Sequence, residues 1–460
     1  MSNQNVFDLV SRGDEGYLVR NMNVLPLWNK YRRIGLDIET CDPQLKELGP
    51  GPRRGGFIVG VSVAVSETEA YYIPLRHSEG NLDHLFAMDY IKGQAKEFRG
   101  EIVGANLSYD LDFLLTAGVR FPHAKFVDVL IADPLIHELH PSYSLNSVSQ
   151  RCGIGKKEND ELYAYAKSIG LNPMTDMHKL PAKAVAKYAA YDAMLPLKII
   201  DKQLPMLAEQ GVEDIWKIES ELLPVLADMR LRGVRVSEQR LEEVSIWAMD
   251  EEIRKLKEIL DATGIAMQPD EVWQPELVAR VLTKAGVHVS KTPTGRFNVD
   301  KIMLESCEHP VASAIARARK VNKLRTTFAE SIRRHMTNGR IHCNFNQLAR
   351  DQGGVIKGAR WGRMSVEHPN LQQQPARDDF SAKWRSIYLP DEGGLWASAD
   401  YSQQEPRLVA HFASIAGCAK ADRAVARYRS DPNTDNHQMM ADLTGLPRKQ
   451  AKNIFPVSYT

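Results

Sequence analysis

Two acidic residues alternate with apolar ones near the start of the chain. Asp37 and Glu39 stand one residue apart in the letters IGLDIET. Side chains alternate along a strand, so on a strand both carboxylates lie on one face. Neighbouring carboxylates repel each other unless a cation joins them. A lone pattern of this kind also fits a solvated edge strand, and further acidic motifs are needed to favour metal binding.

Two later motifs supply more carboxylates and a phenol. The letters NLSYD end at Asp110, which the sequence places at a junction between a strand and a helix, with Asp112 as the neighbouring alternative. The letters YAAYD place Tyr188 and Asp192 four residues apart, on one face of a helix. Such a set can hold two divalent cations about 3.5–4 Å apart, which suits in-line displacement at a phosphodiester, with the tyrosine orienting a water.

The pattern of the chain up to about residue 205 predicts an α/β domain that positions these motifs. Strands are expected at residues 34–39, 57–65, 70–74 and 102–105, and helices at 82–98, 109–117 and 182–207. Helical spacing then dominates at residues 215–232, 238–263, 274–285 and 311–336. A hairpin at 341–348, a strand at 395–400 and a helix at 404–413 are expected in the last part.

Composition excludes several classes of protein. Hydrophobic residues make up 43% and charged residues 25%, which is typical of globular domains. The formal net charge is +1, so any site for a polyanion must be a local patch. Five widely spaced cysteines without a CxxC pair argue against a disulfide framework or a zinc cluster. No apolar run is long enough to span a membrane, and a soluble cytoplasmic protein is expected.

One stretch is strongly basic. Residues 317–363 contain twelve Lys or Arg and only two acids, Glu330 and Asp351. Clustered positive charge favours contact with a phosphate backbone. The alternative is a solvated basic helix face.

The three acidic motifs together resemble the DnaQ-like 3'–5' exonuclease domain, in its tyrosine-containing branch, over residues 32–204. The resemblance implies a ribonuclease H-like fold, a mixed sheet with flanking helices. It implies four metal ligands and a tyrosine that positions the attacking water: Asp37, Glu39, Asp110, Asp192 and Tyr188. The family's spacing from Asn106 favours Asp110 over Asp112, and Asn106 is expected to contact DNA. Either Mg²⁺ or Mn²⁺ suits such a site.

The letters GRMSVEHPNLQQQP, at residues 362–375, resemble the segment that follows the thumb in family A DNA polymerases. The resemblance implies that Arg363, Asn370 and Gln372 lie along the minor groove of the primer–template duplex. Short amides suit that task, since the minor-groove acceptors look alike for every base pair. Arg385 matches a further arginine of the palm.

The letters SADYSQQEPR resemble the first palm motif of the same family. Asp400 is then a metal ligand, Tyr401 lends its carbonyl, and Glu405 crowds the ribose 2' position and favours deoxynucleotides. The letters RKQAK resemble the start of the fingers helix, in which Arg448 and Lys452 face the incoming triphosphate.

The match to the fingers helix fails after Ile454, where Pro456 stands inside the expected helix. The remaining fingers and the palm hairpin with a second catalytic aspartate do not occur in these 460 residues. A truncation, a frameshift and a split gene each explain this ending. The polymerase site is expected to be incomplete and inactive in the lone chain, and the exonuclease active.

The sequence therefore predicts a family A polymerase chain with a proofreading exonuclease. The expected segments are an N-terminal extension (1–31), the exonuclease (32–205), the palm entry and helical thumb (206–340), and an incomplete α+β palm with the start of the fingers (341–460). Expected partners are a single-stranded 3' end, a primer–template duplex and deoxynucleotides. The alternatives are a non-catalytic primer–template binding fragment and the N-terminal half of a split polymerase completed by a second chain.

Overall fold

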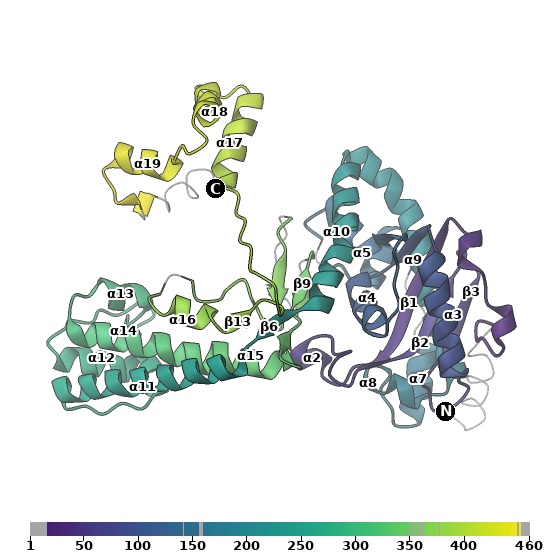
Figure 1. Ribbon diagram of the computed structural model, residues 1–460, viewed down its shortest axis with the longest axis horizontal. Coiled ribbons are helices and arrows are strands. Elements are labelled where there is room, and N and C mark those ends of the chain that lie inside the picture. The colour runs from purple at the N-terminus through teal and green to yellow at the C-terminus, as the bar shows by residue number, and fades with distance from the viewer. Residues whose placement is uncertain are drawn as a thin grey trace. The chain divides into compact units, whose positions relative to one another are not determined.

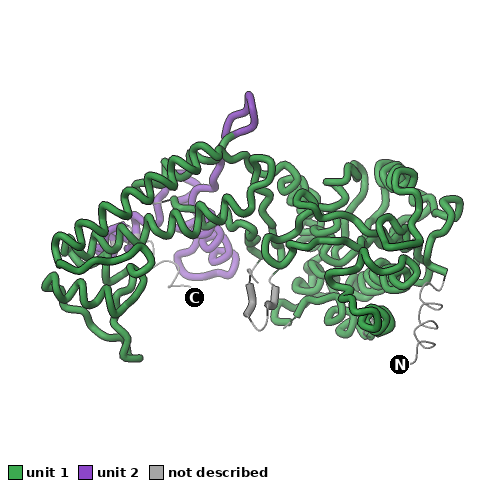
Figure 2. The backbone as a smooth tube through the Cα atoms, turned by 90° about the horizontal axis from the view of Figure 1, so that it is seen from below, with its two compact units in different colours: residues 1–389 green, residues 390–460 purple. Residues whose placement is uncertain are grey.

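The computed structural model describes residues 16–140, 142–155, 160–348, 350–352, 355–357, 362–376, 378–448 and 450–451. The chain divides into two compact units, residues 1–389 and 390–460 (Figure 2). The four segments expected from the sequence, with boundaries after residues 31, 205 and 340, stay a prediction.

A five-stranded mixed sheet lies in the N-terminal part of the first unit. Its strands are β1 (Arg33–Cys41), β2 (Phe57–Ala64), β3 (Ala70–Pro74), β4 (Glu101–Gly104) and β5 (Lys125–Asp128). Their order is β3-β2-β1-β4-β5, with β1 antiparallel to β2 and parallel to β4. The expected α/β architecture with a mixed sheet is confirmed.

Helices flank this sheet (Figure 1). They are α2 (Leu45–Leu48), α3 (His84–Glu97), α4 (Leu107–Thr116), α5 (Val129–Ile136), α6 (Leu145–Arg151), α7 (Asp160–Ser168), α8 (Pro173–Asp176) and α9 (Ala182–Gln210). Short 3-10 turns lie at Met22–Val24, Trp28–Lys30 and Met177–Lys179.

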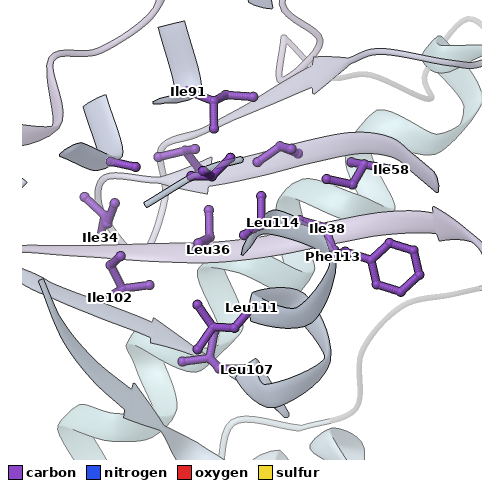
Figure 3. Packing of buried hydrophobic residues seen from close by; sticks show 14 of the residues in the cluster. Ile34, Leu36, Ile38, Ile58, Ile91, Ile102, Leu107, Leu111, Phe113 and Leu114 are labelled. Atoms are coloured by element: carbon purple, nitrogen blue, oxygen red, sulfur yellow. The ribbon is translucent and has the colours of Figure 1, made fainter. Parts of the chain in front are cut away.

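Strand β1 divides its side chains between two faces. Ile34, Leu36 and Ile38 are buried in one apolar cluster with residues of α3 and α4 (Figure 3). The alternate residues include Gly35, whose Cα lies close to the backbone of α9 at Ala193. The two-residue period of the strand thus places the acidic residues on the side of α9.

A helical segment follows. It contains α10 (Glu213–Arg232), α11 (Glu238–Thr263), α12 (Pro275–Lys284), α13 (Lys301–Ser306), α14 (Pro310–Lys323) and α15 (Glu330–His335), with a 3-10 turn at Glu271–Trp273. The helix expected over residues 311–336 is interrupted by a π-helical turn, η5 (Leu324–Ala329). Thr326 Oγ1 donates a hydrogen bond to the carbonyl of Asn322 there (2.9 Å), and such a bond competes with the backbone ladder.

Small sheets complete the first unit. Their strands are β6 (Val234–Val236), β7 (Met336–Thr337), β8 (Arg340–Ile341), β9 (Asn344–Asn346), β10 (Arg350–Gln352), β11 (Val355–Lys357), β12 (Ser365–Glu367) and β13 (Tyr388–Leu389), and the helix α16 is Ser381–Arg385. The hairpin expected at 341–348 is wrong, because β9 pairs with β12 and β8 pairs with β7. Asn338 and Gly339, both with positive φ, make the actual turn between β7 and β8, as an Asn-Gly pair favours.

The described residues of the second unit include the helices α17 (Gln404–Ile415), α18 (Ala421–Ser430) and α19 (Asn436–Thr444). Helix α17 confirms the helix expected at 404–413. The strand expected at 395–400 is wrong: this segment is exposed, with Leu395 94% accessible, and the described residues give it no strand partner. An apolar run forms a strand only where a neighbour satisfies its backbone. Across the described helices of both units, none is long and apolar enough to cross a membrane.

Candidate active site

Three carboxylates from two elements gather at one place. Strand β1 supplies Asp37 and Glu39, and helix α9 supplies Asp192. One carboxylate oxygen of each lies within 4.8 Å of the others. Glu39 is only 9% exposed, so its charge is held near two other carboxylates with little water to screen it.

Asp110 lies beside this group, in the first turn of α4. Its Oδ1 accepts a hydrogen bond from the backbone N–H of Ile38 (3.0 Å), the residue between Asp37 and Glu39. Burial, followed by the charges of Asp128 and Glu39, raises the pKa of Asp110 well above its usual range. A bound cation would reverse that shift, because it favours the charged carboxylate.

Asp112, the alternative to Asp110, has a different set of partners. Its Oδ1 accepts a hydrogen bond from Nη2 of Arg53 (2.8 Å), and its Oδ2 lies 3.2 Å from Nε of Arg230 in α10. The Asp112 side chain is fully buried between these two arginines. The geometry therefore favours Asp110 over Asp112 as the second-motif carboxylate.

Two phenols stand near the carboxylates. Burial, followed by the charges of Asp192, Glu39 and Asp37, raises the pKa of Tyr188 on α9. Its hydroxyl therefore keeps its proton at neutral pH and can donate a hydrogen bond. Tyr163 on α7 is the residue that sequence reasoning missed: its pKa is raised by burial and then by Glu39 and Asp192, and its ring is 38% exposed. No spacing pattern marks Tyr163 in the sequence, since α7 lies between the motifs.

The donor set fits hard divalent cations. The three grouped side chains offer only carboxylate oxygens, which Mg²⁺ and Mn²⁺ prefer. Asp37, Glu39 and Asp192 could hold such ions, with Asp110 beside them.

A cavity of about 470 Å³ lies next to the second motif. Asn106 and Tyr109, at the start of α4, line it on one side. Asn344 of β9 and His368, in the loop after β12, line it on the other. The cavity therefore joins the sheet domain to the segment that resembles the polymerase loop.

That loop is held by its own amides. Asn370 Oδ1 accepts hydrogen bonds from the backbone N–H of Gln372 (3.0 Å) and of Gln373 (3.2 Å). Gln374 Oε1 accepts from the indole of buried Trp384 (2.9 Å) and from the hydroxyl of Tyr388 (3.0 Å). Asn370 and Gln372 thus lie on one turn, and Arg363 is exposed at the start of the loop. Arg385 donates to the carbonyl of Pro375 (3.2 Å).

Fewer cations of the basic stretch are available to contact DNA than the sequence suggests. Several of its cations pair with acids from other segments: Arg317 with Glu251 and Asp379, Lys320 with Glu305 and Asp378, Arg325 with Glu252, Arg333 with Glu242 and Glu330, and Arg334 with Glu47. Lys323 differs because it has no acidic partner among the described residues. Its Nζ lies 5.8 Å from the centroid of the Phe328 ring. Lys323 also lines a cavity of about 410 Å³ with Trp273 and Arg319.

The palm-motif residues lie in the second unit. Asp400 and Tyr401 are exposed in a segment that is neither helix nor strand, and Glu405 stands in the first turn of α17. Nη2 of Arg448 lies 2.7 Å from Oδ2 of Asp435. Lys452 lies outside the described residues.

The fold matches a solved polymerase. The POL domain of Pol1 from M. smegmatis, in complex with DNA primer-template and dNTP, aligns with a TM-score of 0.65. The alignment covers 94% of this chain and 68% of that chain at 17% identity. A likeness at this level shows a shared fold, and it places the chain in the class of DNA polymerase folds.

Sequence relatives identify the family. The profile of DNA polymerase family A matches residues 241–453. A DNA-directed DNA polymerase of Pseudomonas phage M6 is 47% identical over 453 residues, covering 95% of this chain and 68% of the relative. A DNA polymerase of Vibrio phage phiVC8 is 29% identical, covering 85% of this chain and 64% of the relative. The chain belongs to DNA polymerase family A, a family of enzymes that use divalent metals.

Proposed function

We propose that this family A polymerase chain carries a 3'–5' proofreading exonuclease in residues 32–205, with a ribonuclease H-like fold. The observation that carries the proposal is the group formed by Asp37, Glu39 and Asp192, with Asp110 hydrogen-bonded beside it. The family profile begins at residue 241, so the nuclease rests on this geometry and on the three motifs.

Two divalent cations held there would supply a nucleophilic hydroxide for attack on the terminal phosphate and would stabilise the charge that develops on the phosphate and on the leaving 3' oxygen. The side chains of Asp37, Glu39, Asp110 and Asp192 would hold them. Tyr188, which keeps its proton, orients the attacking water by donating or accepting a hydrogen bond. The half-exposed ring of Tyr163 offers a surface on which a terminal base can stack.

The 470 Å³ cavity supports entry of a single strand from the polymerase side. Asn106 and Tyr109 line it beside the nuclease site, and the loop that carries Asn370 and Gln372 begins at its other wall. Amides and a phenol can contact sugars and bases without reading sequence.

The polymerase functions are assigned to residues by the motifs. Arg363, Asn370, Gln372 and Arg385 contact the duplex; Asp400 and Tyr401 hold metal; and Glu405, Arg448 and Lys452 bind the deoxynucleotide. The M. smegmatis polymerase with primer-template and dNTP supports these partners.

Metal-dependent degradation from the 3' end tests the nuclease. A 5'-labelled single-stranded oligonucleotide is expected to shorten one nucleotide at a time with Mg²⁺ or Mn²⁺, because the carboxylate group needs a cation to act. EDTA should stop the ladder, and excess metal should restore it. An oligonucleotide blocked by a 3'-terminal phosphorothioate of the non-hydrolysed configuration is the control. Metal-independent cleavage, or cleavage from the 5' end, would contradict the proposal.

Binding of a primer–template duplex is expected to weaken as salt rises. At least five of the twelve cations of residues 317–363 pair with acids. We expect about three of the others to contact phosphates, and at roughly −0.9 for each contact the slope of log K against log salt is near −3. Lys323→Ala should make that slope shallower by about one contact, whereas exposed Lys284→Ala on α12 should not. Fluorescence anisotropy in EDTA measures both. A slope near zero would leave the stretch as a solvated surface.

A further inference from the structure

A buried charge cluster is centred on Asp112, two residues from Asp110 on α4. Arg230 of α10 is 5% exposed and Asn344 of β9 is 6% exposed, while Asp112 of α4 is fully buried. Nε of Arg230 lies 3.2 Å from Asp112 Oδ2, one Nη donates to Asn344 Oδ1, and the other donates to the carbonyl of Pro50 (3.2 Å). Burial lowers the pKa of Arg230, and the charge of Asp112 opposes that shift.

The cluster joins three parts of the first unit. Asp112 belongs to the helix that carries Asp110, and Pro50 belongs to the loop before β2. Asn344 stands opposite Glu367 in the pairing of β9 with β12, directly before the loop with Asn370. Arg230 itself follows a helix segment whose Leu223 and Ala227 pack into the core of the sheet domain.

Helix α4 is short, and two of its carboxylates hold it in different ways. Asp110 accepts from the backbone of β1, and Asp112 is held by Arg53 and Arg230. A one-turn shift or a rotation of α4 would therefore break both sets of contacts. A buried ion pair contributes little net stability but fixes one arrangement, because leaving either charge unpaired is costly.

We propose that Arg230 is a positioning residue of the nuclease site, acting through Asp112 to hold α4 and hence Asp110 in register with β1. This inference rests on the proposed exonuclease function. It assigns to a helix on the polymerase side, outside residues 32–205, a role in the geometry of the carboxylate site. Arg230 also lines the 470 Å³ cavity, but its charge is paired with Asp112, whose Oδ2 lies 3.2 Å from its Nε. A role in binding the strand would therefore change KM for DNA, whereas a positioning role changes Mn²⁺ affinity and kcat.

The test compares Arg230→Gln with Arg232→Gln, which removes an exposed arginine two residues away on the same helix. Arg230→Gln leaves Asp112 its bond to Arg53, so the fold should persist. It is expected to lower Mn²⁺ affinity, measured by electron paramagnetic resonance, and kcat on single-stranded DNA by about 10- to 100-fold, as loss of an outer partner of a metal ligand does. KM for DNA should change less than twofold. Arg232→Gln should match the wild type in all three.

A second variant distinguishes loss of metal binding from loss of folding. Arg230→Lys keeps the charge but cannot hold Asp112, Asn344 and the Pro50 carbonyl together, so it should lower Mn²⁺ affinity with a smaller change in melting temperature. Wild-type Mn²⁺ affinity and kcat in both variants would overturn the inference, even if the melting temperature falls. A wild-type chain that binds Mn²⁺ at the carboxylates but degrades no DNA would instead contradict the proposed function, and the affinities would still test Arg230.

Discussion

Asp37→Ala combined with Glu39→Ala is expected to reduce 3'-end hydrolysis by several orders of magnitude. Both residues stand on β1 and share with Asp192 the only group of metal-binding side chains found in the described residues. Removing them leaves only Asp110 and Asp192 to hold two cations, so the charge that develops on the attacked phosphate and on the leaving 3' oxygen loses most of its stabilisation. The measurement is a single-turnover rate on a 5'-labelled strand at saturating Mn²⁺.

The rates of further variants distinguish metal ligands from residues that orient the water. Tyr188→Phe keeps the ring and removes the hydroxyl that orients water, so it should cost less than the double variant, on the order of 10²–10⁴. Asp89→Ala with Glu97→Ala, on the exposed face of α3, removes the same formal charge and should leave the rate unchanged. If the Asp37/Glu39 double variant retained the wild-type rate in a preparation free of host nucleases, the assignment of the site would be wrong.

The sequence accounts for the local arrangement of the carboxylates within each element. Asp37 and Glu39 share a face because a strand has a period of two, and Tyr188 and Asp192 share one because a helix repeats near four. Nothing in those periods brings β1 to α9, yet the structure places Asp192 within 4.8 Å of the two strand residues. The resemblance to a nuclease domain supplied that step.

Long-range contacts explain what the sequence missed. The spacing of the residues does not by itself show which of Asp110 and Asp112 lies beside the carboxylates. The partner that distinguishes Asp112 is Arg230, which lies 118 positions away on another helix. The local excess of positive charge overstates the free cations, because acidic partners such as Glu251 and Glu47 lie outside residues 317–363. The expected hairpin failed because β9 found its partner in β12.

Gly35 shows how closely the fold controls the site. A Cβ at Gly35 would lie 2.0 Å from the carbonyl oxygen of Ala193 and 2.9 Å from its carbonyl carbon, both backbone atoms of α9. Backbone atoms cannot change rotamer as a side chain can, so a Cβ at Gly35 would force α9 to move away from β1. Ala193 directly follows Asp192, and the shift therefore separates Asp192 from Asp37 and Glu39.

Gly35→Ala is accordingly expected to destabilise the sheet domain by about 3 kcal/mol, the upper end of the usual cost of overpacking a core. It should also weaken Mn²⁺ binding and slow 3'-end hydrolysis in the fraction that remains folded. Gly93→Ala is the matched control, because a Cβ on that exposed position of α3 meets no atom within 4 Å. Alanine is the better helix former, so this variant should gain up to about 1 kcal/mol.

Urea unfolding followed by circular dichroism, together with Mn²⁺ titration, distinguishes the two effects. A Gly35→Ala chain that unfolds at the same urea concentration as the wild type and binds Mn²⁺ equally would show that α9 does not pack on β1 at this point. A chain that is destabilised but binds Mn²⁺ normally when folded would show that the carboxylates tolerate the displacement. Loss of both stability and Mn²⁺ affinity is the result expected if the absence of a side chain at Gly35 lets α9 pack closely on β1. That packing in turn determines the distance between Asp192 and the strand carboxylates.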